Sequence, residues 1–281
     1  MRKLLVGLLV VLLLGAFAAG CGGTEEKKEE GASKPQQEEL VGTITVAGST
    51  SVQPFSEVLA EAFTAENPKA KVNVQGGGSS QGIEAAKTGA ADIGASSRDL
   101  KPEEKEGMKE FVIARDGIAV VVHPSNQVEG LSVDQIRDIF LGKITNWKQV
   151  GGSDAQIAVV TREAGSGTRD GFEHLVMNKQ PVTDKALVAN SSGAVKSTVA
   201  GDKNAIGYIS MAAIDASVKT LAVDGVKPSK ESVKSAEYKI SRPFIYVTKG
   251  EPTGVAKAFI DFVLGEEGQK LLEDEGAVSI K

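Results

Sequence analysis

The chain has 281 residues, of which 25% are charged and 41% are hydrophobic, and its formal net charge at pH 7 is −5. This length is enough for two modest α/β lobes or for one large domain. The acidic balance argues against a surface that binds nucleic acid or another polyanion. The single cysteine excludes an intramolecular disulfide. A small anion can still bind, because screening limits distant charges to about 8–10 Å whereas loop donors act in contact.

The N-terminal segment reads as a targeting signal rather than as part of the fold. Arg2 and Lys3 precede an almost wholly apolar run at 4–17, and small residues at 18–20 lead into Cys21. This order is typical of a secretory signal, and Cys21 resembles the acylated cysteine of a bacterial lipobox. Ala18 stands where that motif usually has leucine. We expect residues 1–20 to be removed and Cys21 to anchor the protein on the extracytoplasmic face of the cell membrane.

Two other interpretations of this segment remain open. An uncleaved membrane anchor is one, although the apolar run is short against the ~20 residues that a span needs. Plain secretion is the other. Residues 21–40 are polar and lack apolar periodicity, so they are predicted to form a disordered tether. Removal of residues 1–20 takes away two positive charges and no acids, which changes the net charge from −5 to −7.

The first part of the folded region repeats one order: strand, Gly/Ser-rich loop, helix. Predicted strands at 41–46 and 71–74 lead into Gly/Ser-rich loops, and a predicted strand at 92–98 ends in hydroxyls and an arginine. Predicted helices follow at 52–66, 83–88 and 102–109. Ligands of open α/β sheets lie at the carboxyl ends of the strands. We therefore expect the three loops to converge on one site.

The remaining elements predict a second lobe and a return to the first. The predicted strand at 111–123 contains the apolar run 118–122, and the first crossing between lobes is placed at Pro124-Ser125-Asn126. The extended segment 239–248 is the predicted return crossing. This assigns 41–124 plus 242–281 to one lobe and 125–241 to the other. Within these bounds we predict helices at 133–140, 194–200 and 254–272, and strands at 157–160 and 204–210.

A fourth strand–loop–helix unit carries the strongest binding signal. Glycines at 165 and 167 let the backbone turn, Ser166 and Thr168 add hydroxyl donors, and Arg162 supplies a cation with a planar fork. Unpaired N–H groups and the positive dipole end meet at a helix N-terminus, which favours a small tetrahedral oxyanion. The alternative is that Ser166 and its neighbours form only a helix cap and a turn.

Together these motifs resemble the phosphate-binding proteins of bacterial phosphate ABC importers. The resemblance covers nearly the whole mature chain in order, through Ala47-Gly48-Ser49-Thr50-Ser51, Gly78-Ser79-Ser80, Asp92-Ile93-Gly94-Ala95-Ser96, Leu141-Gly142-Lys143-Ile144-Thr145-Asn146-Trp147, Arg162 with Gly165-Ser166-Gly167-Thr168, and Ile206-Gly207-Tyr208. It implies an α/β type II periplasmic-binding-protein fold, with two α/β lobes joined by two hinge crossings. It also implies one dehydrated inorganic phosphate between the lobes and delivery to an ABC permease in the membrane. We expect a monomer that has neither cofactor nor metal and is not an enzyme.

The resemblance also implies a set of ligand-binding residues. Carried over by motif, the phosphate would be held by Thr50, the backbone N–H of Ser51, Ser79, Ser97, Arg162, Ser166, Gly167 and Thr168, with Ser49, Ser80 and Arg98 as second choices. One departure concerns Ser97, because well-known members have an aspartate there that accepts the ligand proton. Asp170, or failing that Glu163, is the predicted substitute acceptor. The departure weakens the choice of phosphate over sulfate or molybdate.

An enzyme is the alternative of a different class. Gly78-Ser79-Ser80-Gln81-Gly82 fits the nucleophile elbow G-x-S-x-G, which would make Ser80 the nucleophile of a serine hydrolase. A triad also needs a histidine, and neither His123 nor His174 lies in an acid-rich loop. The sequence contains no Walker A motif, full G-x-G-x-x-G pattern or spaced His/Cys metal cluster. Trp147 is predicted to be a packing anchor, and Arg242 to fix the hinge.

Overall fold

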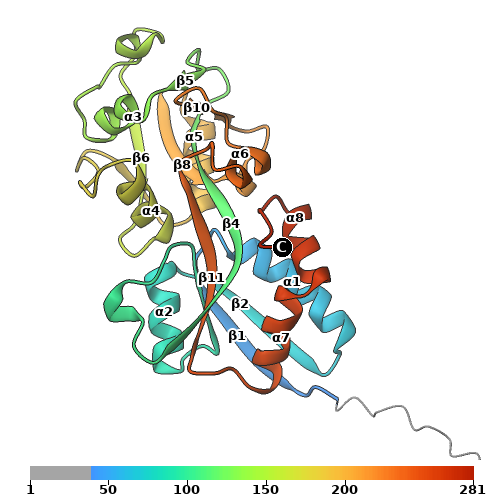
Figure 1. Ribbon diagram of the computed structural model, residues 1–281. Coiled ribbons are helices and arrows are strands. Elements are labelled where there is room, and N and C mark those ends of the chain that lie inside the picture. Colours follow the sequence, from blue (N-terminus) through green and yellow to red (C-terminus); the bar gives the residue numbers. More distant parts are fainter. Residues whose placement is uncertain (1–38) are drawn as a thin grey trace, which may run out of the picture. The chain divides into compact units, whose positions relative to one another are not determined.

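The computed structural model describes residues 39–281 (Figure 1). The predicted signal segment, Cys21 and all but the last two residues of the predicted tether lie outside the described residues. No helix in the described range combines the length and the apolar character that a bilayer crossing requires.

Three parallel strands form one half of the central sheet. β1 (Gly42–Gly48) lies between β2 (Ala70–Gly76) and β3 (Ile93–Ser96), with Gly42 opposite Ala70 and Val46 opposite Ile93. The connecting helices are α1 (Gln53–Glu66) and α2 (Ser79–Thr88). Because the strands are parallel, their carboxyl ends meet at one edge, and the loops after them lie together as predicted.

Two long antiparallel strands continue this sheet into the second half of the molecule. β4 (Met108–Val122) pairs with β11 (Ser241–Lys249), and β11 also pairs with β3. The register between β4 and β11 shifts between Phe244 and Ile245. Within the described residues the strand order of this sheet is β2-β1-β3-β11-β4, followed by β8 (Ala205–Ser210), β6 (Ala158–Arg162) and β7 (Leu187–Ala189), with β9 (Lys219–Thr220) paired to β4. The two strands run from one group of helices to the other (Figure 1).

The second half repeats the parallel arrangement. β6 (Ala158–Arg162) pairs in parallel with both β7 (Leu187–Ala189) and β8 (Ala205–Ser210). The remaining elements are β5 (Gly130–Leu131), α3 (Val133–Phe140), α4 (Gly167–Leu175), α5 (Ser192–Gly201), β9 (Lys219–Thr220), β10 (Ala222–Val223), α6 (Lys230–Lys234), α7 (Gly254–Leu264) and α8 (Glu266–Asp274). We call the part with β1–β3, α1, α2, α7 and α8 lobe I, and the part with β6–β8 and α3–α6 lobe II.

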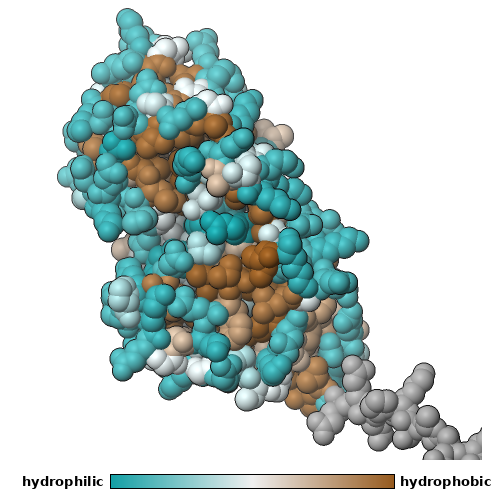
Figure 2. All heavy atoms as spheres, viewed as in Figure 1, coloured by the Kyte–Doolittle hydropathy of each residue, from teal (hydrophilic) through white to brown (hydrophobic). Residues whose placement is uncertain are grey.

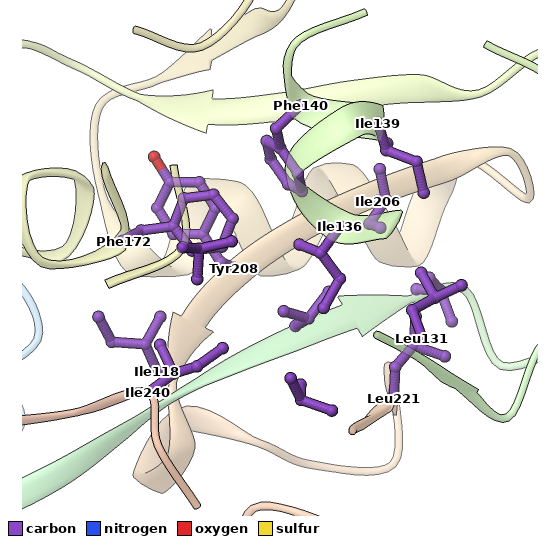
Figure 3. Close-up of a cluster of buried hydrophobic side chains, with 14 of the residues drawn as sticks. Ile118, Leu131, Ile136, Ile139, Phe140, Phe172, Ile206, Tyr208, Leu221 and Ile240 are labelled. Atoms are coloured by element: carbon purple, nitrogen blue, oxygen red, sulfur yellow. The ribbon is translucent and has the colours of Figure 1, made fainter. Parts of the chain in front are cut away.

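Each lobe has its own apolar core. In lobe II the rings of Phe172 and Tyr208 stack with centroids 4.1 Å apart, and Phe140 packs against both (Figure 3). In lobe I, Phe55 packs against Phe244. Outside these cores, hydrophilic residues cover most of the visible face, with apolar patches between them (Figure 2).

The core clusters bear on where the lobes divide. Ile118, Val120 and Val122 pack in the lobe II cluster, whereas Ile113 and Ala114 pack in that of lobe I. The core thus changes between Ala114 and Ile118, whereas the lobe boundaries at 124 and 242 stay a prediction. We propose that β4 passes from one lobe to the other near Asp116, opposite Arg242 of β11.

Most of the predicted elements are confirmed, and two differ. The predicted helix at 102–109 is wrong, because only Pro102–Glu104 forms a 3₁₀ turn and β4 begins at Met108. The turn ends at Lys105, and Gly107, with φ +71°, lies directly before β4. The predicted helix at 254–272 is two helices, because the backbone of Gly265 is extended (φ −71°, ψ 175°) and its N–H donates to the Phe262 carbonyl.

Candidate functional site

Hydroxyl side chains from both lobes meet where the strands end. They come from the loop after β1, the start of α2, the end of β3, the start of α4 and the start of α5. We call this group the hydroxyl cluster: Ser49, Thr50, Ser51, Ser79, Ser97, Thr168 and Ser192. All are buried except Thr50, which is half-buried.

Two hydrogen bonds between hydroxyl groups of the cluster join the lobes. The Ser51 Oγ of lobe I lies 2.9 Å from Thr168 Oγ1 and 2.9 Å from Ser192 Oγ, both of lobe II. The loop after β1 therefore contacts the first turns of α4 and α5.

The lobe I side of the cluster is linked internally. Ser49 Oγ donates to Ser97 Oγ at 2.9 Å, and the Ser97 N–H donates to Ser79 Oγ at 3.0 Å. A hydroxyl group can turn to donate or accept. These hydroxyls can therefore reorient toward an oxyanion placed among them.

Gly167 lets the backbone of α4 approach this group closely. A Cβ at this position would lie 2.2 Å from Ser79 Oγ and 2.7 Å from Ser97 Oγ, so a larger residue would have to displace these two hydroxyls. The loop between β6 and α4 also contacts α2, since the Ser80 N–H donates to the Gly165 carbonyl at 3.1 Å. The first turns of α2 and α4 thus lie close together, with their dipole ends toward the cluster.

Arg162 is the cation of the site. Its side chain is almost fully buried, and it donates from Nη2 to Thr50 Oγ1 at 3.1 Å and from Nη1 to Ser192 Oγ at 3.2 Å. Its Nε and Nη2 donate to the two carboxylate oxygens of Glu163 at 2.8 and 2.7 Å. Glu163 therefore holds the guanidinium with one edge toward the hydroxyl cluster.

Tyr208 supports Arg162 from within lobe II. Its hydroxyl lies 2.7 Å from Thr161 Oγ1 and accepts from the Arg162 N–H at 3.3 Å. Burial raises the pKa of Tyr208 to about 12, so the phenol stays protonated and serves as a neutral hydrogen-bonding group. The ring stacks on Phe172, which fixes the strand end against α4.

Asp170 is the predicted acceptor of the ligand proton, and in the structure its carboxylate pairs with two cations. Its Oδ2 lies 2.8 Å from Arg98 Nε and 3.7 Å from Lys101 Nζ. The Arg98 contact is an ion pair without hydrogen-bond alignment. Arg98 is buried and attracts two acids, since Nη1 and Nη2 also donate to Glu104 at 2.7 and 2.8 Å. The charge of Asp170 thus balances Arg98 instead of turning to the hydroxyl cluster.

Arg242 lies at the crossing between the lobes, where its predicted hinge role would place it. It donates from Nε and Nη2 to Asp116 Oδ2 at 3.2 and 3.1 Å, and from Nη1 to the Ser97 carbonyl at 3.1 Å. Burial raises the pKa of Asp116, an effect that Arg242 and Ser210 oppose. The buried pair joins β4 to β11 and also holds the end of β3.

Trp147 is confirmed as a packing anchor. It is buried in the lobe II core, and its Nε1 donates to the Asn204 carbonyl at 3.0 Å.

The hydrolase alternative finds no support in the geometry around Ser80. Ser80 Oγ accepts from Arg98 Nη2 at 3.0 Å, a contact that does not activate a nucleophile. His123 Nδ1 lies 2.8 Å from Ser125 Oγ instead, in a different part of the chain. In residues 39–281 no group of His, Cys, Asp and Glu side chains is arranged to hold a metal ion.

The structure brings together most of the residues that the sequence singled out. Thr50, Ser51, Ser79, Ser97 and Thr168 form the cluster with Arg162, Gly167 borders it, and Ser166 Oγ caps α4 by accepting from the Arg169 N–H. Ser192 was missed. Ser191 and Ser192 come just before the helix predicted at 194–200, as serines precede other helices of the site. This pattern was the sequence signal by which Ser192 could have been identified.

A bilobal α/β fold with a polar site where its lobes meet is the architecture of a solute-binding protein. Residues 33–267 match the PBP superfamily domain. The phosphate-binding protein PstS of Bacillus subtilis (strain 168) is 38% identical over 97% of this chain and 94% of its own.

Solved structures agree with this assignment. A putative phosphate ABC transporter substrate-binding protein with bound phosphate from Clostridium perfringens is 47% identical (TM-score 0.83; 85% of this chain and 100% of that chain covered). An ABC-type phosphate transport receptor from Vibrio cholerae is 40% identical (TM-score 0.71; 84% and 99% covered). The chain therefore belongs to the PBP superfamily and, within it, to the family of phosphate-binding proteins.

Proposed function

We propose that this protein is the extracytoplasmic receptor that binds inorganic phosphate between its lobes and delivers it to the permease of an ABC importer. The observation that carries the proposal is the convergence of the hydroxyl cluster on Arg162 from both lobes. The relatives from Bacillus subtilis, Clostridium perfringens and Vibrio cholerae are all named for phosphate, and one of them is described with phosphate bound.

The donor set suits a small tetrahedral oxyanion. Every oxygen of such a ligand accepts hydrogen bonds, and the cluster supplies hydroxyls that now bond to one another. In our proposal Thr50, Ser51, Ser79, Ser97, Arg162, Ser166, Gly167 and Thr168 turn their donors to the phosphate. Arg162 adds a planar fork, and the first turn of α4 adds backbone N–H groups.

The energetics are consistent with tight binding. If six to eight charge-assisted hydrogen bonds each contribute roughly 1.5–3 kcal/mol, their gross sum exceeds the ~8 kcal/mol of a micromolar dissociation constant. The surplus offsets desolvation of the ligand and closure of the lobes. Closure would be a hinge motion at the β4 and β11 crossings.

The anchor and the partners complete the proposal. Acylated Cys21 would hold the receptor at the outer face of the cell membrane, and the tether would let the lobes reach the permease. We propose that the receptor works as a monomer, without cofactor or metal, and that it is not an enzyme.

Titration calorimetry of the mature protein tests the function. Phosphate should bind more tightly than sulfate or molybdate, because the ligand proton of phosphate can be donated to a hydroxyl of the cluster. Tighter binding of sulfate or molybdate would assign the receptor to another oxyanion. Turnover of a model ester that Ser80→Ala abolishes would favour the hydrolase alternative.

A further inference from the structure

Ser192 of lobe II contacts the loop after β1 through two hydrogen bonds. It is the first residue of α5, and its side chain is buried. Its Oγ lies 2.9 Å from Ser51 Oγ, and its N–H donates to Thr50 Oγ1 at 3.3 Å. The start of α5 therefore makes side-chain and backbone contacts with lobe I.

A cavity of about 380 Å³ lies directly beside this contact. Thr50, Ser51 and Ser192 belong both to its lining and to the hydroxyl cluster. Phe55 and Ile214 add apolar surface to the lining. The Ser51–Ser192 hydrogen bond therefore joins two residues that border both the cavity and the rest of the cluster.

We propose that Ser192 is a specificity-determining residue, which together with Ser51 forms a wall that restricts the site to inorganic oxyanions and excludes phosphate monoesters. This inference rests on the proposed function. A monoester carries a carbon substituent on one oxygen, and the partly apolar cavity has a volume within the range of small-molecule pockets. A substituent that enters the cavity between Ser51 and Ser192 would have to break the contact between them.

The same hydroxyl group also holds the cation. Ser192 Oγ accepts from Arg162 Nη1 at 3.2 Å, so a ligand that displaces it would leave a buried N–H without a partner. An unsatisfied buried donor is unfavourable, and more so when it is charged. Exclusion of monoesters therefore has two sources: the steric wall and the lost contact to Arg162.

Calorimetric titration with inorganic phosphate and with methyl phosphate tests this inference. The wild type should bind phosphate and show no measurable binding of methyl phosphate. Ser192→Gly should bind phosphate about three- to tenfold more weakly, because one hydrogen bond is lost. It should bind methyl phosphate within about tenfold of phosphate, since the wall is open. Ser192→Ala, which keeps more helix propensity, should shift in the same direction.

Ser191→Gly is the matched control. Ser191 caps α5 by accepting from the Ala194 N–H but is not part of the hydroxyl cluster, and glycine is only slightly worse than serine at a helix cap. It should keep the wild-type discrimination. The inference is overturned if Ser192→Gly and Ser192→Ala bind phosphate and still reject methyl phosphate, or if both variants lose phosphate binding altogether. Absence of phosphate binding in the wild type would instead overturn the proposed function.

Discussion

Arg98 of lobe I and Asp170 of lobe II form an ion pair between the lobes, with Nε 2.8 Å from Oδ2. Arg98 is buried and also pairs with Glu104. It therefore forms ion pairs with two acids, one in the 3₁₀ turn at Pro102–Glu104 and one in α4. The pair lies outside the hydroxyl cluster. It therefore stabilises the contact between the lobes without being positioned to accept a proton from a ligand.

The first prediction follows from that position of Asp170. Asp170→Asn should weaken phosphate and sulfate binding by the same factor, because it loosens the contact between the lobes and leaves the ligand donors intact. A partly exposed ion pair of this kind contributes about 0.2–1 kcal/mol to stability. Calorimetric titration with both anions measures the two factors. Asp99→Asn, an exposed neighbouring acid, is the control. A narrowed phosphate preference in Asp170→Asn would restore Asp170 as the acceptor of the ligand proton.

The second prediction concerns Arg162. Arg162→Ala should reduce phosphate affinity by about 2–5 kcal/mol, because a buried charge-assisted partner of the anion is lost. Arg162→Lys keeps the charge but not the planar fork, so its loss should be smaller. Titration calorimetry distinguishes the three proteins. Unchanged binding in Arg162→Ala would remove Arg162 from the site.

The third prediction concerns selectivity at Ser97. Ser97 lies between Ser49 and Ser79, and its hydroxyl can donate or accept. Ser97→Asp should weaken sulfate binding more than phosphate binding, because a carboxylate accepts the ligand proton of phosphate and repels a fully deprotonated anion. Ser97→Ala should not increase the ratio of phosphate affinity to sulfate affinity above that of the wild type. Competition titrations measure the ratio, and an unchanged ratio in Ser97→Asp would mean that Ser97 does not face the ligand proton.

The fourth prediction is a pH dependence of stability that arises from Glu104. Burial tends to raise the pKa of Glu104, but hydrogen bonds from Arg98 and from the Lys101 N–H outweigh it and hold the pKa below its ordinary value of 4.5. The unfolded chain therefore binds the proton more readily than the folded chain. The stabilisation is present above pH 4.5 and is lost as pH falls through the lower, folded-state pKa.

Glu104→Gln isolates this contribution. Urea unfolding at pH 7 should show the variant to be less stable than the wild type, and the difference should shrink as the pH falls below 4.5. Glu103→Gln is the matched control, because Glu103 lies beside Glu104 and is exposed. A difference that stays constant with pH would show that the carboxylate charge of Glu104 does not stabilise the fold.

The fifth prediction concerns the anchor. Cys21→Ala should release the protein into the soluble fraction and leave phosphate binding intact, since Cys21 is not one of the predicted ligand-binding residues. Fractionation and mass spectrometry of the mature N-terminus check this. A wild-type protein that is soluble and carries no lipid would contradict the lipoprotein assignment.

The sequence by itself determined the elements and the kind of residue at the end of each strand. Hydrophobic periodicity and turn chemistry act over a few neighbouring residues, so α3 was predicted with the bounds that the structure shows, Val133–Phe140. The same local signals identified the Ser/Gly loops and Arg162. They failed at 102–109, where Pro102 and its acidic neighbours resemble a helix start but no apolar face follows.

Only the tertiary structure decided which of these residues meet. Ser51 and Ser192 are 141 positions apart in sequence, and Asp116 and Arg242 are 126 apart, yet each pair is in hydrogen-bond contact. No local pattern encodes such a pairing, because it depends on the register of β4 and β11 and on how the two lobes pack. Asp170 shows the consequence: its position in α4 made it a candidate for the ligand, and the approach of Arg98 from lobe I gave its charge another partner.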